Sequence, residues 1–561
     1  MPVAILSPYV KSATPINQLN VSARNYALLL FGCVLFHIAG TWSLPLIDRD
    51  EPRFAEASRE MTERGDYIVP RFNNQLRLDK PPLTYWAQTA SYRVFGQNDF
   101  AARFPSAIAA ALTAVVIFAW GSRLRPATAS QARIGAAKVG WWAAIIFTLS
   151  LQSFLHAKAA VADMWLVLFM TIAHWAGYEL MQRPRLSAQR STLNKGAAVF
   201  QPPWALRKAL FLVFYLALAL GFLAKGPIGW TPLLTVGVTI LFARDLRLTR
   251  QLKFVRGIAL MLAVVALWGI PALIQTHGEF FAVGIGRHVI GRSFATMEGH
   301  GANSFWMYLL LLPFYFLTIF VSFFPWSIKL PWLTKELWRK RKAGIADPGY
   351  NENKIDNYLL ACVAIIFIIF TLVRTKLPHY TLPAFPLLAL LLARYWSRQG
   401  HSVGRKLDGF KPSSLKTVEN ESIVRGGRFF FKPIVIVTAC LWLAVALIVP
   451  PLVARSFPAY TLFQQSRAYL QQNMQLPSVD FEEPSLVWYF RSRVNGFLTP
   501  MNSRHAAEFM EKPGARFVVL PTSMVTTLFG NHPQTWKIFS TRGFNIAKGK
   551  RVELTLVLKP E

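Results

Sequence analysis

Long apolar segments recur along most of the chain and alternate with short polar stretches. Segments 27–39, 107–120, 210–224 and 434–449 are apolar almost from end to end. With its flanking residues, each approaches the roughly 20 residues that a helix needs to cross about 30 Å of hydrocarbon. The pattern predicts a polytopic α-helical membrane protein with about 11 spans. These spans are expected near residues 26–46, 100–121, 139–157, 160–181, 208–224, 228–243, 254–276, 304–326, 357–374, 378–396 and 432–453.

The polar stretch after the first span, about 47–99, is long and contains two helical patterns. Charged residues at helical spacing predict a helix over 53–64, and we interpret these later charges as a solvated helix face. They are Glu56, Arg59, Glu60 and Glu63. Segment 81–96 is amphipathic and too short for a crossing, so we expect it to lie along the outer surface of the membrane.

The chain becomes polar from about residue 455. Strand-like runs occur at 486–490, 517–520 and 552–558, and residues 503–512 predict a helix that begins with a serine cap. We therefore expect a membrane domain over 1–454 and a small α/β domain over 455–561. The intervening stretch 400–428 is rich in Gly, Ser and Lys and is typical of a flexible cytoplasmic loop.

Positive charge is concentrated in every second loop. Lys and Arg number 61 against 28 Asp and Glu, which gives a net charge of +33. In a soluble protein this excess would indicate nucleic-acid binding, but basic cytoplasmic loops of a membrane protein produce the same excess. We infer a cytoplasmic N-terminus and no nucleic-acid partner. The basic loops are residues 122–138, 182–207, 244–253, 327–356 and 397–431.

This orientation places the loop 47–99 and the C-terminal domain on the extracytoplasmic face of an inner (plasma) membrane. The start of the chain lacks the charged segment and cleavage site of a signal peptide, so we expect the first span to be retained. Three cysteines, Cys33, Cys362 and Cys440, fall inside apolar segments. They support neither a disulfide framework nor a metal-ligand pattern.

Carboxylates at the outer membrane boundary are the first candidates for chemistry. Asp50 and Glu51 follow the first span directly, at a depth where an unpaired carboxylate is costly. Asp163 stands at the head of an apolar span, and its alternative role is to complement a helix N-terminus. We predict a functional role for all three residues.

Cations on the same face suit a phosphate group. Lys80 is followed by two prolines that restrict the backbone, and its alternative role is that of a snorkelling lysine at the interface. Further cations occur at Lys225, between Arg287 and Arg292, and within 374–380. Loop 277–303 adds candidate ligands for a divalent metal, although none has a recognised ligand spacing. They are His277, Glu279, His288, Glu298 and His300.

Several linked blocks of the outer segments resemble one known family. Residues 50–56 (DEPRFAE), followed by 59–61, resemble the opening signature of bacterial aminoarabinose transferases and related dolichyl-phosphate-mannose-type glycosyltransferases. Blocks 65–73, 80–86 and 376–383 are similar to later signatures of the same family. The resemblance implies a GT-C fold with about 11–13 transmembrane helices. It also implies a cavity open to the outer leaflet.

The resemblance further implies roles for individual residues. Asp50 and Asp163, with Glu51 beside them, would line the catalytic cavity. The carrier phosphate would be contacted by Lys80, Arg292, Tyr380, Lys376 and Arg53. Some family members carry zinc with a carboxylate beside the lysine of the KPP block, and here an aspartate replaces the usual glutamate. This difference leaves metal binding open: the sequence commits to no cofactor, and a divalent metal, zinc or magnesium, would have the candidate ligands Asp79, His288 and His300.

The expected function is transfer of a sugar from a polyprenyl-phosphate donor to a lipid A-like glycolipid, a glycan or a protein. The leaving phosphate gains negative charge, which fixed cations would stabilise. An acceptor hydroxyl needs a general base, and Asp50 is the first candidate. If the acceptor is a phosphate, Asp50 would instead orient groups or stabilise positive charge at the sugar. The alternative is a transporter or flippase of lipid-linked sugars, but such proteins show broken helices and repeated halves.

Overall fold

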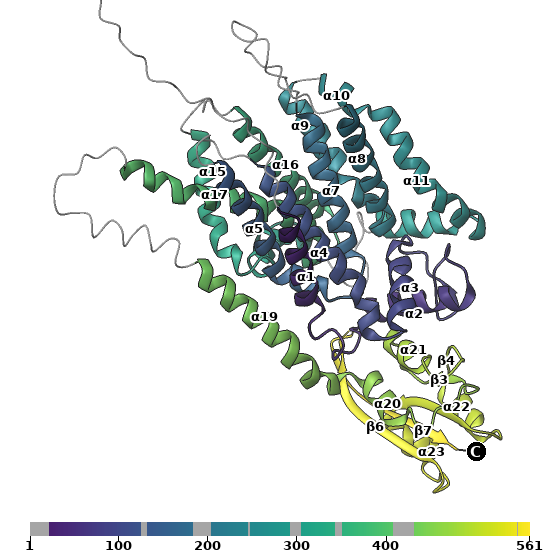
Figure 1. Cartoon of the computed structure of the whole chain (residues 1–561). Helices are drawn as coiled ribbons and strands as arrows, with labels where there is room; N and C mark the ends of the chain where they lie inside the picture. The colour runs from purple at the N-terminus through teal and green to yellow at the C-terminus, as the bar shows by residue number, and fades with distance from the viewer. Residues whose placement is uncertain are drawn as a thin grey trace, which may run out of the picture.

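The computed structural model describes residues 22–124, 132–182, 204–244, 247–291, 304–342, 350–407, 431–546 and 548–560. A helical bundle forms one end of the molecule and a small α/β domain forms the other, with α2 and α3 between them (Figure 1). The predicted loop 400–428 lies outside the described residues from 408 onward.

The bundle contains helices that overlap every predicted span. In chain order they are α1 (Ala23–Ile38), α4 (Asp99–Arg123), α5 (Ala132–Leu149), α6 (Leu151–Ala157), α7 (Asp163–Met181), α8 (Trp204–Lys225), η2 (Pro227–Trp230), α9 (Thr231–Ala243), α10 (Arg247–Leu252), α11 (Phe254–Gln275), η3 (Phe281–Gly291), α13 (Phe305–Leu310), α14 (Phe314–Ser322), η4 (Trp326–Lys329), α15 (Leu330–Lys342), α16 (Tyr350–Leu372), η5 (Pro378–Ala384), α17 (Phe385–Leu407) and α19 (Phe431–Val453). Within the described ranges, 5 helices are long and apolar enough to cross a membrane by themselves. The number is 7 if each of two bent pairs counts as one span. The chain is a multi-pass membrane protein.

One of these bends lies between α5 and α6, whose axes differ by 69°. The Ser150 hydroxyl donates back to the Ile146 carbonyl, and the Leu151 N–H donates to the Phe324 carbonyl at 2.9 Å. The backbone N–H at the break therefore leaves the helical ladder for a partner on another segment, which is a physical cause of a sharp bend. The bend sets the direction of α6, which carries His156.

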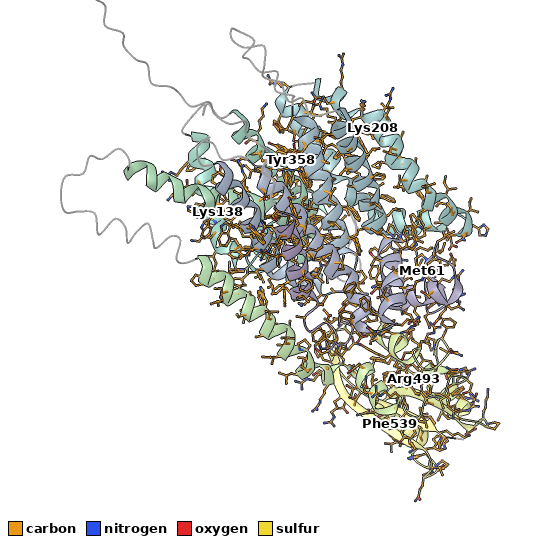
Figure 2. The ribbon with its side chains drawn as sticks, in the orientation of Figure 1. Met61, Lys138, Lys208, Tyr358, Arg493 and Phe539 are labelled. Atoms are coloured by element: carbon orange, nitrogen blue, oxygen red, sulfur yellow. The ribbon has the colours of Figure 1, made fainter. Side chains whose placement is uncertain are left out.

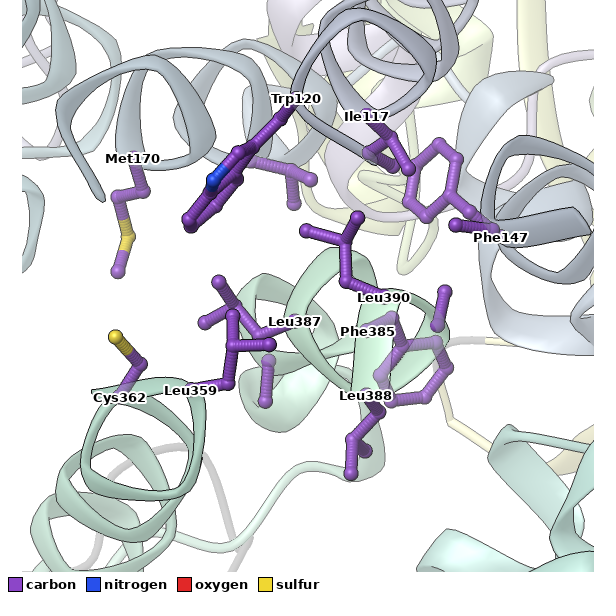
Figure 3. Packing of buried hydrophobic residues seen from close by; sticks show 14 of the residues in the cluster. Ile117, Trp120, Phe147, Met170, Leu359, Cys362, Phe385, Leu387, Leu388 and Leu390 are labelled. Carbon is purple, nitrogen blue, oxygen red and sulfur yellow. The ribbon is translucent and has the colours of Figure 1, made fainter. Parts of the chain in front are cut away.

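The bundle core is packed closely where α4, α5, α7, α16 and α17 meet. Figure 3 shows Trp120, Phe147 and Leu390 directed into this region from three different helices. A Cβ atom added at Gly121 would lie 2.7 Å from the Cα atom of Gly140. Small residues at such a crossing allow two helix backbones to approach closely in a membrane.

The first outer loop forms two helices and a short hairpin. They are α2 (Asp50–Arg64), β1 (Arg71–Phe72), β2 (Gln75–Leu76) and α3 (Leu83–Phe95). Helix α2 begins earlier than the predicted helix over 53–64, and it ends where Gly65 adopts a φ of 68°. Left-handed backbone of this kind is the usual terminus of a helix and favours glycine.

The prediction that water covers the charged face of α2 is wrong. Glu56, Arg59 and Glu60 are buried, with 0%, 2% and 0% of their surfaces exposed. The C-terminal domain covers this face, and Arg491 forms ion pairs with Glu56 and Glu63. The sequence pattern of a charged helix face is the same whether water or another domain covers that face. The pattern alone therefore does not predict whether the charges are exposed or buried.

The C-terminal domain is a mixed sheet covered by short helices. Its elements are η6 (Ala454–Ser456), α20 (Pro458–Ser466), β3 (Leu476–Ser478), α21 (Pro484–Phe490), β4 (Leu498–Pro500), α22 (Ser503–Glu511), β5 (Arg516–Pro521), α23 (Thr522–Phe529), β6 (Lys537–Asn545) and β7 (Lys550–Lys559). The sheet order is β4-β3-β5-β7-β6. β3 is parallel to β4 and β5, whereas β5, β7 and β6 are antiparallel neighbours.

Two of the three predicted strands are confirmed as β5 and β7. The predicted strand at 486–490 is wrong, because these residues form part of the buried helix α21, which begins at Pro484. A fully buried apolar run has no polar face that would distinguish helical from strand periodicity. Helix α22 is confirmed, but its cap is Asn502, whose side chain accepts from the His505 N–H at 2.8 Å, and not a serine.

Candidate functional site

Asp163 is the centre of a charged group at the end of the bundle that contacts α2. It is the first residue of α7, where the helix dipole favours a carboxylate. Lys225, the last residue of α8, places its ammonium group 2.5 Å from Asp163 Oδ1. The glycine at 226, with a φ of 81°, and the following proline end α8 at this point. Two helix ends with opposite charges therefore meet here.

Aromatic and imidazole rings complete this group. His379 Nε2 lies 4.0 Å from Asp163 Oδ1, and the rings of His156 and His379 are 5.1 Å apart between centroids. The Lys225 ammonium lies 5.7 Å from the ring centroid of Tyr380. His156 comes from α6, while His379 and Tyr380 come from η5, so four separate segments build the site.

A second group of charges lies in the first outer loop. The buried Arg77 guanidinium is 3.0 Å from Asp79 Oδ1 and donates to the Tyr85 hydroxyl at 2.8 Å. Burial lowers the pKa of Arg77, but the carboxylates of Asp79 and Asp50 outweigh it and raise this pKa above its usual range. Asp79 is therefore occupied by a guanidinium that stays charged.

Lys80 belongs to the second group and interacts electrostatically with the first. Its ammonium donates to the Asp79 carbonyl at 3.3 Å and lies 3.9 Å from Asp79 Oδ2. Lys80 also interacts electrostatically with His379 of the first group. The lysine of the first loop and the tyrosine-containing block near residue 380, which are far apart in sequence, are thus near enough to interact electrostatically.

The residues at the start of α2 separate into exposed and buried groups. Asp50 is exposed, and Arg53 one turn later is half-buried. Glu51 is buried and accepts from Arg103 Nε and Nη2 at 2.9 and 2.7 Å. It also accepts from the Ala160 N–H at 2.6 Å. Glu51 therefore holds α2 against α4 and against the turn before Asp163.

Lys376 is directed toward backbone carbonyls. Its ammonium donates to the carbonyls of Phe370 and Thr371 at 3.0 and 2.6 Å, near the C-terminus of α16. Burial lowers the pKa of Lys376 to about 8. A lysine in this position satisfies the last carbonyls of a helix, and its contact with a carrier phosphate stays a prediction.

Three predicted residues of loop 277–303 cannot be compared with this site. Arg292 and His300 lie outside the described residues, and so does the side chain of His288. The sequence had also indicated Lys225 as an outer cation, but it had assigned no role to His156 or His379. The sequence offers one indication of these two histidines, which is that each lies close to a motif residue.

One group of described residues has the composition of a metal site. Ligand atoms of His156, Asp163 and His379 all lie within 4.8 Å of one another. Two imidazoles and a carboxylate are a donor set that zinc accepts. However, the Lys225 ammonium already occupies Asp163 at 2.5 Å, and a divalent ion would have to displace it. The arrangement therefore favours lysine over a metal at this carboxylate.

Comparisons with known proteins agree with this architecture. Residues 79–192 match the family described as dolichyl-phosphate-mannose-protein mannosyltransferase. The undecaprenyl phosphate-alpha-4-amino-4-deoxy-L-arabinose arabinosyl transferase of Edwardsiella ictaluri is 28% identical over 67% of this chain and 60% of its own length. The second such transferase of Sodalis glossinidius is 31% identical over 64% of this chain and 58% of its own length. The chain thus aligns with about three fifths of these relatives.

A solved structure extends the similarity to nearly the whole fold. The crystal structure of ArnT from Cupriavidus metallidurans bound to undecaprenyl phosphate has a TM-score of 0.69 and 19% identity to this chain. The match covers 95% of this chain and 98% of that one. The chain therefore has the same GT-C fold as ArnT, and its sequence is similar to the aminoarabinose transferases and to the dolichyl-phosphate-mannose protein mannosyltransferase family.

Proposed function

We propose that this chain is a membrane glycosyltransferase that moves a sugar from a polyprenyl-phosphate donor to an envelope acceptor. The observation that carries the proposal is the position of the Lys225 ammonium, which pairs with Asp163 and lies 5.7 Å from the centroid of the Tyr380 ring. Lys80 of the first outer loop is a second cation and interacts electrostatically with His379. Cations and a hydroxyl at one apolar boundary suit a lipid-linked phosphate. The named relatives are transferases that use undecaprenyl-phosphate sugars, and they lend no support to a transporter.

The site supports a single displacement at the anomeric carbon of the donor. The bond from this carbon to the phosphate oxygen breaks, and the polyprenyl phosphate leaves with the electron pair. Lys80, Lys225 and the Tyr380 hydroxyl would stabilise the new charge, typically by a few kcal/mol for each donor in a dry site. The Lys225 ammonium can leave the Asp163 carboxylate and pair with the phosphate, because both are anions and either can be the partner of the ammonium.

The acceptor oxygen forms the new bond to the anomeric carbon. A hydroxyl acceptor would give its proton to Asp50, which is exposed at the first turn of α2 and thus accessible to an incoming group. A phosphate acceptor, as on a lipid A-like glycolipid, is already anionic and needs no base. Asp50 would then stabilise positive charge on the sugar.

We place the reaction on the extracytoplasmic face of the inner membrane. The first outer loop and the C-terminal domain are in contact at the same end of the bundle, whereas α10 lies at the other end (Figure 1). The basic loops predicted to be cytoplasmic include 244–253, which contains α10. Positive loops mark the cytoplasmic side of a membrane protein, so the candidate site would face outward.

The decisive experiment uses purified full-length protein in detergent or liposomes. It is incubated with labelled polyprenyl-phosphate aminoarabinose or mannose and with envelope lipids, glycans or proteins as acceptors. We expect transfer by wild type and strong loss in Asp163→Asn. Absence of transfer with every donor and acceptor class, together with transport of the intact donor across liposomes, would refute the proposal in favour of a transporter.

No step of this mechanism passes through a metal ion. If zinc binds, it would do so at His156, Asp163 and His379, as a Lewis acid beside the leaving phosphate, after Lys225 is displaced. We expect transfer to survive treatment with EDTA and added Zn²⁺ to inhibit it. Loss of activity on chelation, with recovery on adding zinc, would show that the ion and not Lys225 is the resident cation.

A further inference from the structure

Helix α21 of the C-terminal domain lies against the segment that leads into α2. The Tyr489 hydroxyl accepts from the Leu46 N–H at 2.8 Å. The backbone N–H and the hydroxyl of Ser485 donate to the Asp48 carboxylate at 2.9 and 2.5 Å. Two residues of α21 thus hold the chain at 46 and 48, immediately before Asp50.

Residues at the end of α21 and just after it also contact α2 directly. Arg491 follows α21 and pairs with Glu56, and its Nη2 atom lies 2.8 Å from Glu63 Oε2. Arg59 of α2 donates to Glu56 at 2.7 Å and to the Trp488 carbonyl at 2.9 Å. Its guanidinium also lies 3.9 Å from the centroid of the Trp488 ring. Side chains of both partners therefore interlock across the domain boundary.

All but one of these charges are removed from water, the exception being Glu63, whose side chain is 41% exposed. The side chains of Glu56 and Arg491 are 0% and 5% exposed. A buried charge that loses its partner is strongly destabilised, so such a network tolerates only one arrangement of the two helices. The ion cluster formed by Glu56, Arg59, Glu63 and Arg491 therefore fixes where α2 lies relative to the C-terminal domain.

On its other side, α2 is held by the bundle. Glu51 bonds to Arg103 of α4 and to the Ala160 N–H, three residues before Asp163. Glu56 is about 9 Å along the helix from Asp50, at 1.5 Å for each residue. Asp50 thus stands at the end of a short helix that is fixed from two sides, while its own side chain is exposed.

We propose that Ser485, Tyr489 and Arg491 position Asp50 for the transfer reaction, so that the C-terminal domain completes the active site from outside it. The inference rests on the proposed function. These three residues contact the backbone or side chains of 46–63 and act through that segment, and the Tyr489 hydroxyl also donates to Asp99, the first residue of α4, at 2.9 Å. Lys80, Lys225 and Tyr380 lie on segments that α21 does not hold, so binding of the donor phosphate should be independent of it.

The test is Arg491→Gln in the full chain. We expect kcat to fall by about 10- to 100-fold, because a displacement of about 1 Å at a reacting group can cost 100-fold in rate. The KM for the donor should change by less than about twofold, since the phosphate-binding residues are untouched. Arg491→Lys, which keeps a charge that can still reach Glu56 or Glu63, should recover part of kcat.

Hydrogen–deuterium exchange supplies a readout that does not need activity. Residues 46–56 should exchange faster in Arg491→Gln than in wild type. The matched control is Arg504→Gln, because Arg504 forms a 3.3 Å pair with Glu508 within the same domain, and both side chains are exposed. This control should leave kcat, KM and exchange across 46–56 unchanged.

The possible outcomes separate the two proposals. Unchanged kcat in a folded Arg491→Gln protein, or reduced kcat without faster exchange across 46–56, would overturn positioning by α21. If Arg491→Gln fails to fold, Tyr489→Phe removes one hydroxyl, keeps the packed ring and is held to the same expectations. If wild type shows no transfer with any donor, the proposed function fails, and with it the inference that rests on it.

Discussion

At the scale of single residues, the partner of each carboxylate decides what that carboxylate can do. Asp163 is paired with the ammonium of Lys225, whose side chain is 17% exposed, and in the proposed reaction this ammonium turns to the phosphate. Glu51 is bonded to a buried guanidinium and to backbone N–H groups, and these have no substitute in the low-dielectric interior. Asp50 is exposed. We therefore propose a chemical role for Asp50 and Asp163 and a positioning role for Glu51.

Lys225→Met should separate phosphate binding from folding. The variant keeps the length and apolar stem of the side chain but removes the ammonium that faces Asp163 and Tyr380. We expect kcat/KM for the donor to fall by about 100-fold or more, the usual cost of one lost transition-state donor. Kinetics with a labelled donor measure this ratio. A variant with wild-type kcat/KM would show that Lys225 only neutralises Asp163.

Asp48 should make the stability of the domain contact depend on pH. Burial raises the pKa of Asp48 to about 7, although the Ser485 hydrogen bonds and Arg53 oppose this and Glu483 adds to it. The folded state therefore binds a proton more tightly than the unfolded state, in which the pKa is about 4. Stability should rise as pH falls from about 7 toward 4 and be lost as pH rises through 7.

The measurement is thermal unfolding of wild type and Asp48→Asn between pH 5 and pH 8. The asparagine can still accept from the Ser485 N–H but cannot ionise. We expect the difference in midpoint temperature between the two proteins to increase with pH, in favour of the variant. A constant difference across this range would contradict a titrating Asp48.

At the scale of elements, α2 and α21 show the limits of local patterns. The helical spacing of charges correctly predicted a helix in the first outer loop. The same pattern did not reveal that α21 and Arg491 cover its charged face, because their partners lie more than 400 residues away, as in the pair Glu56–Arg491 with a separation of 435. The apolar run that forms α21 also lacked any polar face that could indicate its period.

Glu51→Gln should destabilise the contact between α2 and the bundle. The variant leaves Arg103, which is 1% exposed, without its buried anionic partner. We expect a loss of about 3–5 kcal/mol, the usual cost of breaking a buried pair on one side. The double variant Glu51→Gln with Arg103→Met should recover much of this loss. Unfolding in denaturant compares the three proteins, and equal destabilisation of single and double variants would argue against the pair.

At the scale of the whole molecule, the first outer loop and the C-terminal domain share one side of the bundle. Figure 2 shows Met61 of α2 at the end of the bundle near Arg493, with Lys208 near the opposite end. The C-terminal domain and the first outer loop are joined by Asp48–Ser485, Glu56–Arg491 and Asn73–Leu498 contacts. These contacts place residues 50 and 455 on the same side of the membrane. The chain therefore crosses the membrane an even number of times between them.

Thiol labelling in intact cells tests this arrangement. We expect Ser503→Cys to react with a membrane-impermeant maleimide from outside, and Arg250→Cys to react only after permeabilisation. Both positions are exposed, and the variants are made in a chain whose three cysteines are replaced by alanine. Protection of residue 503 in intact cells would invert the proposed orientation and move the candidate site to the cytoplasm.

The sequence by itself determined the helical membrane architecture, the order of its apolar segments and the outer motifs that contain Asp50, Lys80, Asp163 and Tyr380. These features are local, because spans depend on about 20 consecutive apolar residues and orientation depends on loop charge. The sequence also indicated a small C-terminal α/β domain and two of its strands correctly.

Only the tertiary structure decided which of these residues share a site and which hold it together. The pairing of Asp163 with Lys225, the approach of His156 to His379 and the use of Lys376 to cap α16 join segments that the sequence leaves separate. Glu51 and Asp50 are neighbours in the chain, yet one is buried in an ion pair and the other is exposed. The physical reason is that burial and ion pairing depend on which distant segment packs against a residue, and residue spacing along the chain does not specify that.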